Sequence, residues 1–494
     1  MKNLTRTIIL SFSLAVLCSA VLHAQQPDDY LSSDFHQSRR AELRKVMPKN
    51  SVAVFFSNAI RNRANDVNFN YHQDPNFHYL TGHNAPHSVL LIFSEDQATG
   101  GKLFNELLFV RGRNALKELY DGKRISPEEA VEQLAIATVL YNADFKEFPI
   151  DFSEFDQVLF QDFQEDVRNT SEEGDLYDLI AQFKVKANYP DTETLSIELE
   201  PQLNNLNTTL LNELLAPIRG IKTEEELDLL RKAIRISAIG QAEVMKAMEP
   251  GLSEFKVQGM HEFIFKQYKA EFEGYPSIVG AGHNGCILHY IDNYNPAIED
   301  GELILMDLGA EYHGYTADVT RTIPVNGKFS KEQKIIYDFV YEAQEAAMSI
   351  AKAGVKFSAL YDTTLAVINK GLLAMGIVKS LTAEDLINPA TGRHWYYPHG
   401  CCHHIGLDVH DLGTYDLLEA GMVITIEPGI YIPNGSPCDE KWWNIPVRIE
   451  DDYLITAEGI ELLSDDAPRK SSEIEKLMKE NSAFQEFNLP VIDE

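Results

Sequence analysis

Apolar and polar positions follow two different patterns in the first part of the chain. The runs "SVAVFF" and "HSVLLIF" are apolar and β-favouring, which predicts buried strands. In contrast, "SPEEAVEQLAIA" places apolar residues at helical spacing behind a serine that can cap a helix. Strands and helices mixed in this way over residues 25–212 predict a separate α/β domain.

A break in the pattern at "LLAPIRGIKTEEE" marks the expected domain boundary. Pro217 and Gly220 interrupt the apolar periodicity, and Thr223 followed by glutamates is typical of a helix N-cap. We therefore expect a second domain over residues 213–494.

The second domain contains a weak internal repetition. Segments 249–266 and 352–370 each follow a long amphipathic pattern, and Gly251 and Gly354 lie 103 positions apart. Each segment is followed by β-favouring runs that carry carboxylates. Two such units packed about a pseudo-twofold axis would bring their acidic strands together.

The first acidic segment, "LILMDLGAEYHGYTADVTRTI", is typical of a β-hairpin. With the turn centred on Tyr312 and His313, Asp307 lies opposite Asp318, with Cβ atoms about 4.5–5.5 Å apart. Two like charges this close and flanked by apolar residues are costly without a cation between them. We therefore expect a metal ion there; two aspartates at a solvated turn are the alternative.

Two glutamates repeat this arrangement. Glu427 in "VITIEPGIYI" and Glu450 in "PVRIEDD" each end an apolar, β-favouring run. A buried glutamate is usually paired with a metal or another cation. Arg448 lies two residues before Glu450 on the same strand face, so a structural salt bridge is the alternative.

The segment "HGCCHHIGLDVHD" (399–411) supplies histidines that can complete an oxygen-rich site. Its glycines and mixed polarity predict a loop leading into a strand. A zinc finger would need a second Cys/His cluster at suitable spacing, which the chain lacks. Oxygen ligands with one or two nitrogens favour Mn²⁺, with Co²⁺ and Zn²⁺ as alternatives. Two bridged metal ions would activate water and polarise a carbonyl.

The amino terminus predicts export. Residues 1–24 place Lys2 and Arg6 before an apolar run that ends in small residues, as in a cleaved signal peptide. A membrane anchor is the alternative, and no later segment approaches the ~20 apolar residues of a membrane span. We therefore expect a periplasmic or secreted protein without a membrane span.

Charge and cysteine content exclude two classes of protein. Loss of residues 1–24 changes the formal charge from −32 to −34, which argues against binding to a phosphate backbone and so against nucleic acid as a partner. Four cysteines remain after cleavage, too few for a disulfide framework in a chain of 494 residues.

Five separated motifs resemble one family of metallopeptidases. The segments "IVGAGHNGCILHY", "MDLGAEYHGYTADVTRTIPVNGKFS", "HGCCHHIGLDVHD", "TIEPGIYI" and "RIEDD" are similar in order and spacing to those of aminopeptidase P and prolidase. The stretch "RNRANDVNFNYHQDPNFHYLTGHNAPHSVLLIF" resembles the accessory domain of that family. The resemblance implies an α/β (α+β) fold, with a pseudo-twofold pita-bread catalytic domain preceded by a separate α/β N-terminal domain.

The resemblance also implies a site for two divalent metal ions, most often manganese. Matched position by position, with Asp318 and Glu450 as the bridging residues, the ligands are Asp307, Asp318, His403, Glu427 and Glu450. His403 is preferred to His404 because it precedes His410 by seven residues, as the family ligand precedes its second histidine. The residues matched to catalysis are Glu427, His399, His410 and Arg448, and those matched to substrate binding are His289, Tyr431, His399 and His410.

The activity implied is hydrolysis of the bond between an N-terminal residue and proline at position 2 of a peptide, with Glu427 moving the proton. A prolidase restricted to Xaa-Pro dipeptides is the alternative, although "NYHQDPNFHYLTG" favours aminopeptidase P. A non-catalytic binding protein of this fold usually loses ligands, and creatinase-like enzymes lack this ligand set. We also expect a homo-oligomer.

The chain departs from the family at Cys401 and Cys402, where small or hydroxyl residues are usual. We expect both cysteines to serve as small hydrophobic residues.

Overall fold

The computed structural model describes residues 29–99, 101–190 and 205–484. The predicted export signal, residues 1–24, lies outside the described residues. The described residues from Ser33 onward belong to one compact unit. In this unit an α/β part is followed by a part made of two similar halves, as the sequence predicts.

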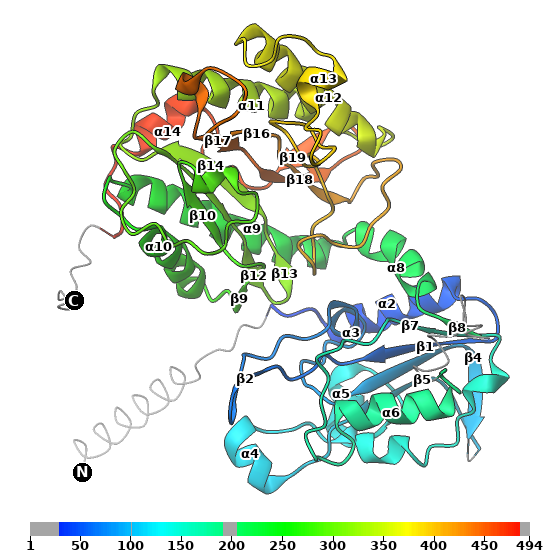
Figure 1. Ribbon diagram of the computed structural model, residues 1–494. Coiled ribbons are helices and arrows are strands. Elements are labelled where there is room, and N and C mark those ends of the chain that lie inside the picture. The colour runs from blue at the N-terminus through cyan, green and yellow to red at the C-terminus, as the bar shows by residue number, and fades with distance from the viewer. Residues whose placement is uncertain (1–28, 100, 191–204, 485–494) are drawn as a thin grey trace, which may run out of the picture. The chain divides into compact units, whose positions relative to one another are not determined.

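The first part is built on a six-stranded mixed sheet of order β6-β5-β4-β1-β7-β8 (Figure 1). The predicted strands "SVAVFF" and "HSVLLIF" form its two central members, β1 and β4, which pair antiparallel. β1 pairs parallel with β7 on its other side. The strands are β1 (Ser51–Phe56), β4 (Val89–Thr99), β5 (Lys102–Val110), β6 (Val139–Tyr141), β7 (Gln157–Phe160) and β8 (Leu206–Asn207), with a separate hairpin of β2 (Asn62–Ala64) and β3 (Val67–Asn68).

Helices accompany this sheet, and phenylalanines fill much of its core. Ser126 caps the helix predicted from "SPEEAVEQLAIA", and Glu129 completes a capping box. The helices are α2 (Ser33–Val46), α3 (Pro75–Thr81), α4 (Ala115–Asp121), α5 (Pro127–Leu134) and α6 (Leu176–Lys186), with the short 3₁₀ turns η1 (Asn142–Phe145) and η2 (Phe152–Glu154).

Two helices lie where the sequence predicts a domain boundary. Thr223 caps α9 (Glu224–Ala247) in a capping box, as predicted. Pro217 does not interrupt the preceding helix, because α8 (Leu210–Gly220) continues through it. Leu215 and Arg219 are buried on either side of the proline, and this packing outweighs the cost of a proline inside a helix. The boundary between residues 212 and 213 falls inside α8, and the division into domains stays a prediction.

The rest of the chain consists of two similar halves, each with a helix pair beside its strands (Figure 1). In the first, α9 and α10 contact strands of two sheets, of order β10-β11-β14 and β13-β12-β9. Its elements are α10 (Glu254–Gln267), β9 (Phe272–Glu273), β10 (Ile278–Ala281), η3 (Asn284–Cys286), β11 (Leu303–Leu308), β12 (Ala310–Tyr312), β13 (Tyr315–Thr316) and β14 (Val319–Pro324).

In the second half, α11 and α12 pack together, and α11 contacts strands of the sheets β15-β18-β19 and β16-β17. Gly251 and Gly354 adopt φ values of +90° and +87° in the turns before α10 and α12, so the predicted repetition extends to backbone conformation. The elements are α11 (Lys331–Ile350), α12 (Phe357–Ala374), α13 (Ala383–Leu386), β15 (Val423–Ile426), β16 (Gly429–Ile432), η4 (Glu440–Trp442), β17 (Ile445–Arg448), β18 (Asp451–Ile455), β19 (Ile460–Leu462) and α14 (Ser471–Leu477).

The predicted hairpin forms, but its predicted register is wrong by two positions. Asp307 pairs with Thr320 rather than with Asp318, and Tyr312 pairs with Tyr315. The two-residue turn is therefore His313 and Gly314, with φ values of +52° and +86°. Such a turn needs left-handed backbone at both positions, which places the glycine inside the turn. A shift of two keeps each side chain on its face, so Asp318 stays on the side of Asp307.

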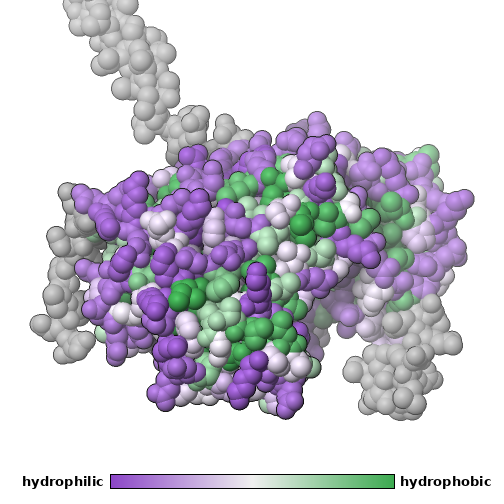
Figure 2. Space-filling view, turned by 90° about the horizontal axis from the view of Figure 1, so that it is seen from above, coloured by the Kyte–Doolittle hydropathy of each residue, from purple (hydrophilic) through white to green (hydrophobic). Residues whose placement is uncertain are grey.

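Within the described residues, no helix combines the length and the apolar character needed to cross a bilayer. On the face shown in Figure 2, hydrophobic and hydrophilic residues are interspersed.

Candidate metal centre

The five predicted metal ligands come from corresponding places in the two halves. Asp307 lies in β11 and Asp318 directly precedes β14, whereas Glu427 directly follows β15 and Glu450 follows β17. His403 lies in the loop before β15, and its carbonyl accepts a hydrogen bond from the Thr425 amide at 2.9 Å. The strand predicted at the end of this loop is reduced to an isolated bridge between His404 and Ile424.

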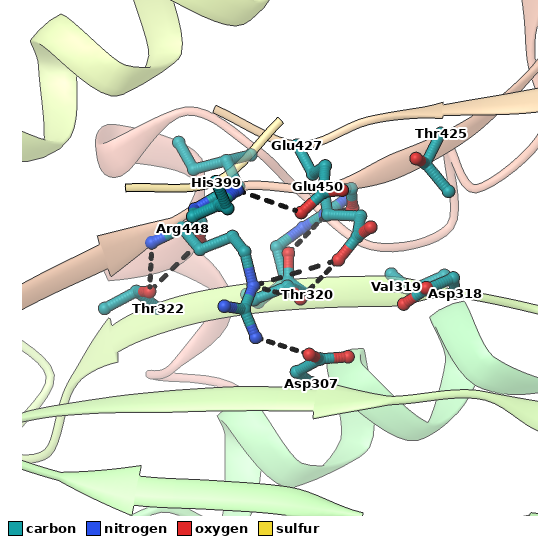
Figure 3. A network of polar contacts seen from close by, with 12 residues as sticks. Asp307, Asp318, Val319, Thr320, Thr322, His399, Thr425, Glu427, Arg448 and Glu450 are labelled. Carbon is teal, nitrogen blue, oxygen red and sulfur yellow. Dashed lines mark hydrogen bonds and ion pairs between the residues drawn. The ribbon is translucent and has the colours of Figure 1, made fainter. Parts of the chain in front are cut away.

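The side chains of these residues converge, and Figure 3 labels the four acids among them. His403 Nε2 lies 3.5 Å from Asp318 Oδ2, 3.8 Å from Glu427 Oε1 and 4.0 Å from Glu450 Oε1. One ligand atom each from Asp318, His403 and Glu450 lies within 4.8 Å of the others. Asp307 and Asp318 are only 7% and 6% exposed, so the alternative of a solvated turn is wrong.

Burial of so many acids shifts their protonation. Burial raises the pKa of Asp307, Glu427 and Glu450, that of Glu427 to about 7, and repulsion from neighbouring carboxylates adds to each shift. Burial acts to lower the pKa of His403, but its hydrogen bond to Asp318 and the charge of Glu427 raise it to about 9. Without a metal ion, the imidazole is therefore a cation among the carboxylates.

Arg448 is the second cation of this cluster, and it contacts Asp307 more closely than Glu450, the partner in the alternative salt bridge. Its Nη2 donates a hydrogen bond to Asp307 Oδ2, whereas its Nε lies 3.9 Å from Glu450 Oε2. Nε also donates to Thr320 Oγ1 at 3.1 Å, and Nη1 donates to Tyr431 Oη at 2.9 Å. Arg448 thus connects an acid of the first half with a tyrosine of the second.

Sequence reasoning missed two hydroxyl groups in the cluster. The Tyr275 hydroxyl lies 2.6 Å from Oδ1 of both Asp307 and Asp318, and Thr320 Oγ1 donates to Glu450 Oε2 at 2.6 Å. Tyr275 precedes the strand that pairs with β11, and nothing in its local "EGYPSIV" context indicates a role beside acids. Thr320 could have been found from the hairpin, because in the true register it lies opposite Asp307.

His399 and Tyr431 lie together beside Glu427. His399 Nδ1 is 2.6 Å from the Gly400 carbonyl and 3.5 Å from Glu427 Oε2, while Nε2 is 2.9 Å from Tyr431 Oη. Burial, with the charge of Arg448, lowers the His399 pKa to about 3, so the ring is neutral. A carbonyl can only accept, so Nδ1 carries the proton and the Tyr431 hydroxyl donates to Nε2.

The other two histidines of the predicted substrate site are exposed. The ring of His410 lies 4.3 Å from that of His403, centroid to centroid. His289 acts electrostatically on both His399 and His410, since its charge contributes to lowering the pKa of each. His404 lies elsewhere, with Nε2 2.9 Å from the Thr414 carbonyl and its ring against Phe357.

Cys401 and Cys402 have different surroundings, although their sulfur atoms are 3.4 Å apart. Cys401 is 1% exposed, and its carbonyl accepts a hydrogen bond from the Glu427 amide at 2.7 Å. Cys402 is partly exposed. Both are free thiols, as are Cys286 and Cys438 among the described residues.

The donor set fits divalent metal ions. Three buried carboxylates, the partly buried Glu427 and one imidazole are the ligand types that Mn²⁺ and similar ions accept, and two cationic side chains do not balance four acids. The Tyr275 phenol carries one proton and can donate to only one of the two carboxylates it touches. The hydroxyl oxygen and the oxygen of the other carboxylate then have no proton between them, so their contact at 2.6 Å is repulsive unless a second proton or a cation is near. The roles of the individual residues as ligands stay predictions.

Comparison with known proteins gives a consistent result. Residues 228–457 match the model of metallopeptidase family M24, and residues 36–156 match the aminopeptidase P N-terminal domain. The chain is 34% identical to a Xaa-Pro aminopeptidase of Haemophilus influenzae and 33% identical to one of Escherichia coli; each alignment covers 91% of this chain and 98% of the relative. Among solved structures, aminopeptidase P from E. coli with the inhibitor Pro-Leu matches with a TM-score of 0.78 at 31% identity, covering 91% of this chain and 98% of the other. These matches confirm the family, the fold and the two-part architecture that the motifs predict.

Proposed function

Because this chain belongs to metallopeptidase family M24, among the Xaa-Pro aminopeptidases, we propose that it is an exported enzyme that removes the first residue from peptides with proline at position 2. Two divalent metal ions, manganese in preference to cobalt or zinc, would serve this hydrolysis. The observation that carries the proposal is the convergence of four carboxylates and His403 on one buried place between the two halves.

The substrate bond explains why such a site is needed. The bond before proline is a tertiary amide without N–H, so enzymes that hold substrates by strand pairing recognise it poorly. A rigid site that binds the carbonyl directly avoids this difficulty. The four predicted acidic ligands lie in or next to the ends of paired strands, which gives the site that rigidity.

The metal ions would be held by the five predicted ligands, with Asp318 and Glu450 bridging. When bound, they would polarise the scissile carbonyl and lower the pKa of the attacking water. Tyr275 and Thr320 fix Asp318 and Glu450 by hydrogen bonds, so these carboxylates need little reorganisation to act as ligands.

Glu427 is the residue we assign to proton transfer. Its carboxylate reaches His403 and His399, and its amide is held by the Cys401 carbonyl, so its position is fixed on both sides. From this position it can take a proton from the attacking water and pass it to the leaving prolyl nitrogen. His399, beside Glu427, and His410, exposed beside His403, would hold the developing oxyanion, and His289 acts electrostatically on both.

Export and assembly are further parts of the proposal. Residues 1–24 have the pattern of a cleaved signal, which would place the enzyme in the periplasm or outside the cell. Peptides are the partners, and the strong negative charge disfavours nucleic acid. A homo-oligomer is expected from the family resemblance.

A substrate series tests the activity and separates it from that of a prolidase. We expect manganese-loaded protein to release the free first residue from tripeptides and longer peptides beginning Xaa-Pro, with higher kcat/KM than on the matched Xaa-Pro dipeptide. Binding energy from residues beyond proline is available only with the longer substrates. Peptides with alanine at position 2 are the control and should be cleaved poorly. Hydrolysis of the dipeptides with negligible action on tripeptides would instead show a prolidase.

A further inference from the structure

The N-terminal part contains a second polar cavity, which shares no residue with the metal centre. Its volume is about 1300 Å³, and it is lined by the β2–β3 region, the loop at His83 to His87, the end of β5, α4 and residues 168–172. Five lysine and arginine residues line it against three carboxylates, in a chain whose formal net charge is −32. A basic cavity in so acidic a protein indicates a specific use for positive charge.

At this cavity, Arg124 and Arg111 have buried N–H groups without hydrogen-bond partners. Arg124 Nη1 donates to the Gly112 carbonyl at 3.0 Å and to Glu172 Oε1 at 2.8 Å. Its Nε and Nη2 are buried and have no hydrogen-bond partner among the described residues, although Nη2 forms a long ion pair with Asp121 Oδ2 at 3.8 Å. The Nε of Arg111 is likewise buried and unpartnered, and no ion pair of Arg111 is found within the described part of the chain.

Two buried histidines add to this set. His87 is 2% exposed, and its Nδ1 accepts a hydrogen bond from the Leu176 amide at 2.9 Å. Burial, with the charge of Arg111, lowers the pKa of His87 and of His83 to about 4, so both rings are neutral at pH 7. The proton of His87 must then lie on Nε2, which is buried without a partner in the described structure, as is Nε2 of His83.

The two guanidinium groups also act on one another. Burial and the charge of Arg124 lower the pKa of Arg111. Two like charges held together with unpaired N–H groups are unfavourable unless a negative group joins them. Glu172 accepts a hydrogen bond from one nitrogen of Arg124, and the other two nitrogens have no hydrogen-bond partner among the described residues. What these buried N–H groups lack is a hydrogen-bond acceptor, and a negatively charged one with no proton to donate would suit them best.

We propose that Arg111, Arg124 and His87 form a binding site for an oxyanion, either the carboxylate of a small organic acid or inorganic phosphate. The planar guanidinium fork matches both anions with paired hydrogen bonds, and a neutral His87 adds one more donor without more charge. The site is separate from the metal centre, so it does not depend on the proposed peptidase activity.

Calorimetric titration of the full-length, metal-loaded protein tests this site. Acetate and inorganic phosphate are titrated separately at constant ionic strength, with chloride as the reference anion. We expect saturable binding of at least one of them that Arg111→Gln weakens at least about tenfold. The anion that binds saturably shows whether the site takes a carboxylate or inorganic phosphate. Arg111→Lys, which keeps the charge and loses the fork, should bind more weakly than the wild type.

Two controls separate this site from other effects. Arg113→Gln removes the same charge two positions away, where the guanidinium pairs with Glu118 and does not line the cavity, and it should leave binding unchanged. Anions bound at the metal ions would still bind to Arg111→Gln, so only the part of the anion binding that this variant loses is assigned to the cavity.

Because Arg111 has no ion pair within the described residues, Arg111→Gln should unfold in chloride at the wild-type temperature or above it. No saturable binding, binding equal in Arg111→Gln, or a lower unfolding temperature of that variant would each overturn the proposal.

Discussion

The guanidinium of Arg448 donates a hydrogen bond to the carboxylate of Asp307, and the two buried residues come from different halves of the repeat. The same guanidinium donates to Thr320 and Tyr431. One side chain therefore holds together β11, β14, β16 and β17 at the place where the acids converge. In the metal-free protein, Arg448 and His403 are the cations that make this concentration of carboxylates tolerable.

Arg448→Met should destabilise the metal-free protein much more than the manganese-loaded protein. Removing one member of a buried pair leaves an uncompensated charge and typically costs about 3–5 kcal/mol. Bound metal ions supply positive charge and should reduce this loss. Unfolding by urea with and without Mn²⁺ measures both values. Arg231→Met, which breaks an exposed pair with Glu461, is the control and should cost little in either state. An equal loss for Arg448→Met in both states would contradict this account.

The position of the acids could be predicted from the sequence because apolar runs that end in a carboxylate mark the ends of buried strands. Asp307, Glu427 and Glu450 were found in this way, and the structure places all three beside His403 or Arg448. The predicted hairpin register is wrong by two positions because the predicted turn is centred one residue too early along the chain. Both residues of such a turn need positive φ, so the turn has to include Gly314.

The hydrogen bonds around the acids could not be predicted from the same patterns. Tyr275 reaches Asp307 across 32 positions and Arg448 reaches it across 141, so these contacts depend on how separate strands pack. Local periodicity carries no information on such distances. The continuation of α8 through Pro217 has a similar cause, because burial of Leu215 and Arg219 overrides a local preference.

Asp318→Ala and Glu450→Ala should each lose most of the bound metal. Ligand atoms of both carboxylates and of His403 lie within 4.8 Å of one another, and as bridging residues each carboxylate would contact both ions. Elemental analysis after loading with Mn²⁺ should give close to two ions per wild-type chain. Asp439→Ala, which removes an exposed carboxylate, is the control and should bind metal normally. Full metal content in both ligand variants would show that the metal lies elsewhere.

Glu427→Gln should lower kcat by about 10²–10⁴, the range for lost general acid–base catalysis. The amide keeps the shape of the side chain but cannot accept a proton. Loss of its charge also weakens a ligand, so kcat must be compared at saturating Mn²⁺. Steady-state kinetics on a Xaa-Pro-Xaa tripeptide provides the measurement. Activity close to wild type would remove Glu427 from the proton-transfer role.

His399→Ala and His410→Ala should reduce turnover while metal content stays near that of the wild type. His399 orients Tyr431 and lies beside Glu427, and His410 is exposed next to His403, so each is placed for the substrate and not for the ions. Kinetics and elemental analysis on the same preparations separate the two effects. Loss of metal in either variant would mean that the histidine is a ligand.

His261 should make the stability of the fold fall as the pH is lowered. Its side chain is fully buried in α10, and burial lowers its pKa to about 4, although the Val257 carbonyl partly opposes this. An unfolded chain takes up the proton near pH 6.5, so it binds more protons than the native state between about pH 6.5 and 4. The contribution of His261 is thus complete above pH 6.5 and is lost as the pH falls toward 4. Between about pH 7 and pH 5 the free energy of unfolding falls by roughly 2 kcal/mol through this group.

In His261→Leu, the free energy of unfolding measured with urea should therefore decrease less over this range than in the wild type. The exposed His283→Leu is the control and should keep the wild-type dependence. A decrease in His261→Leu as large as that of the wild type would assign the pH dependence to other groups.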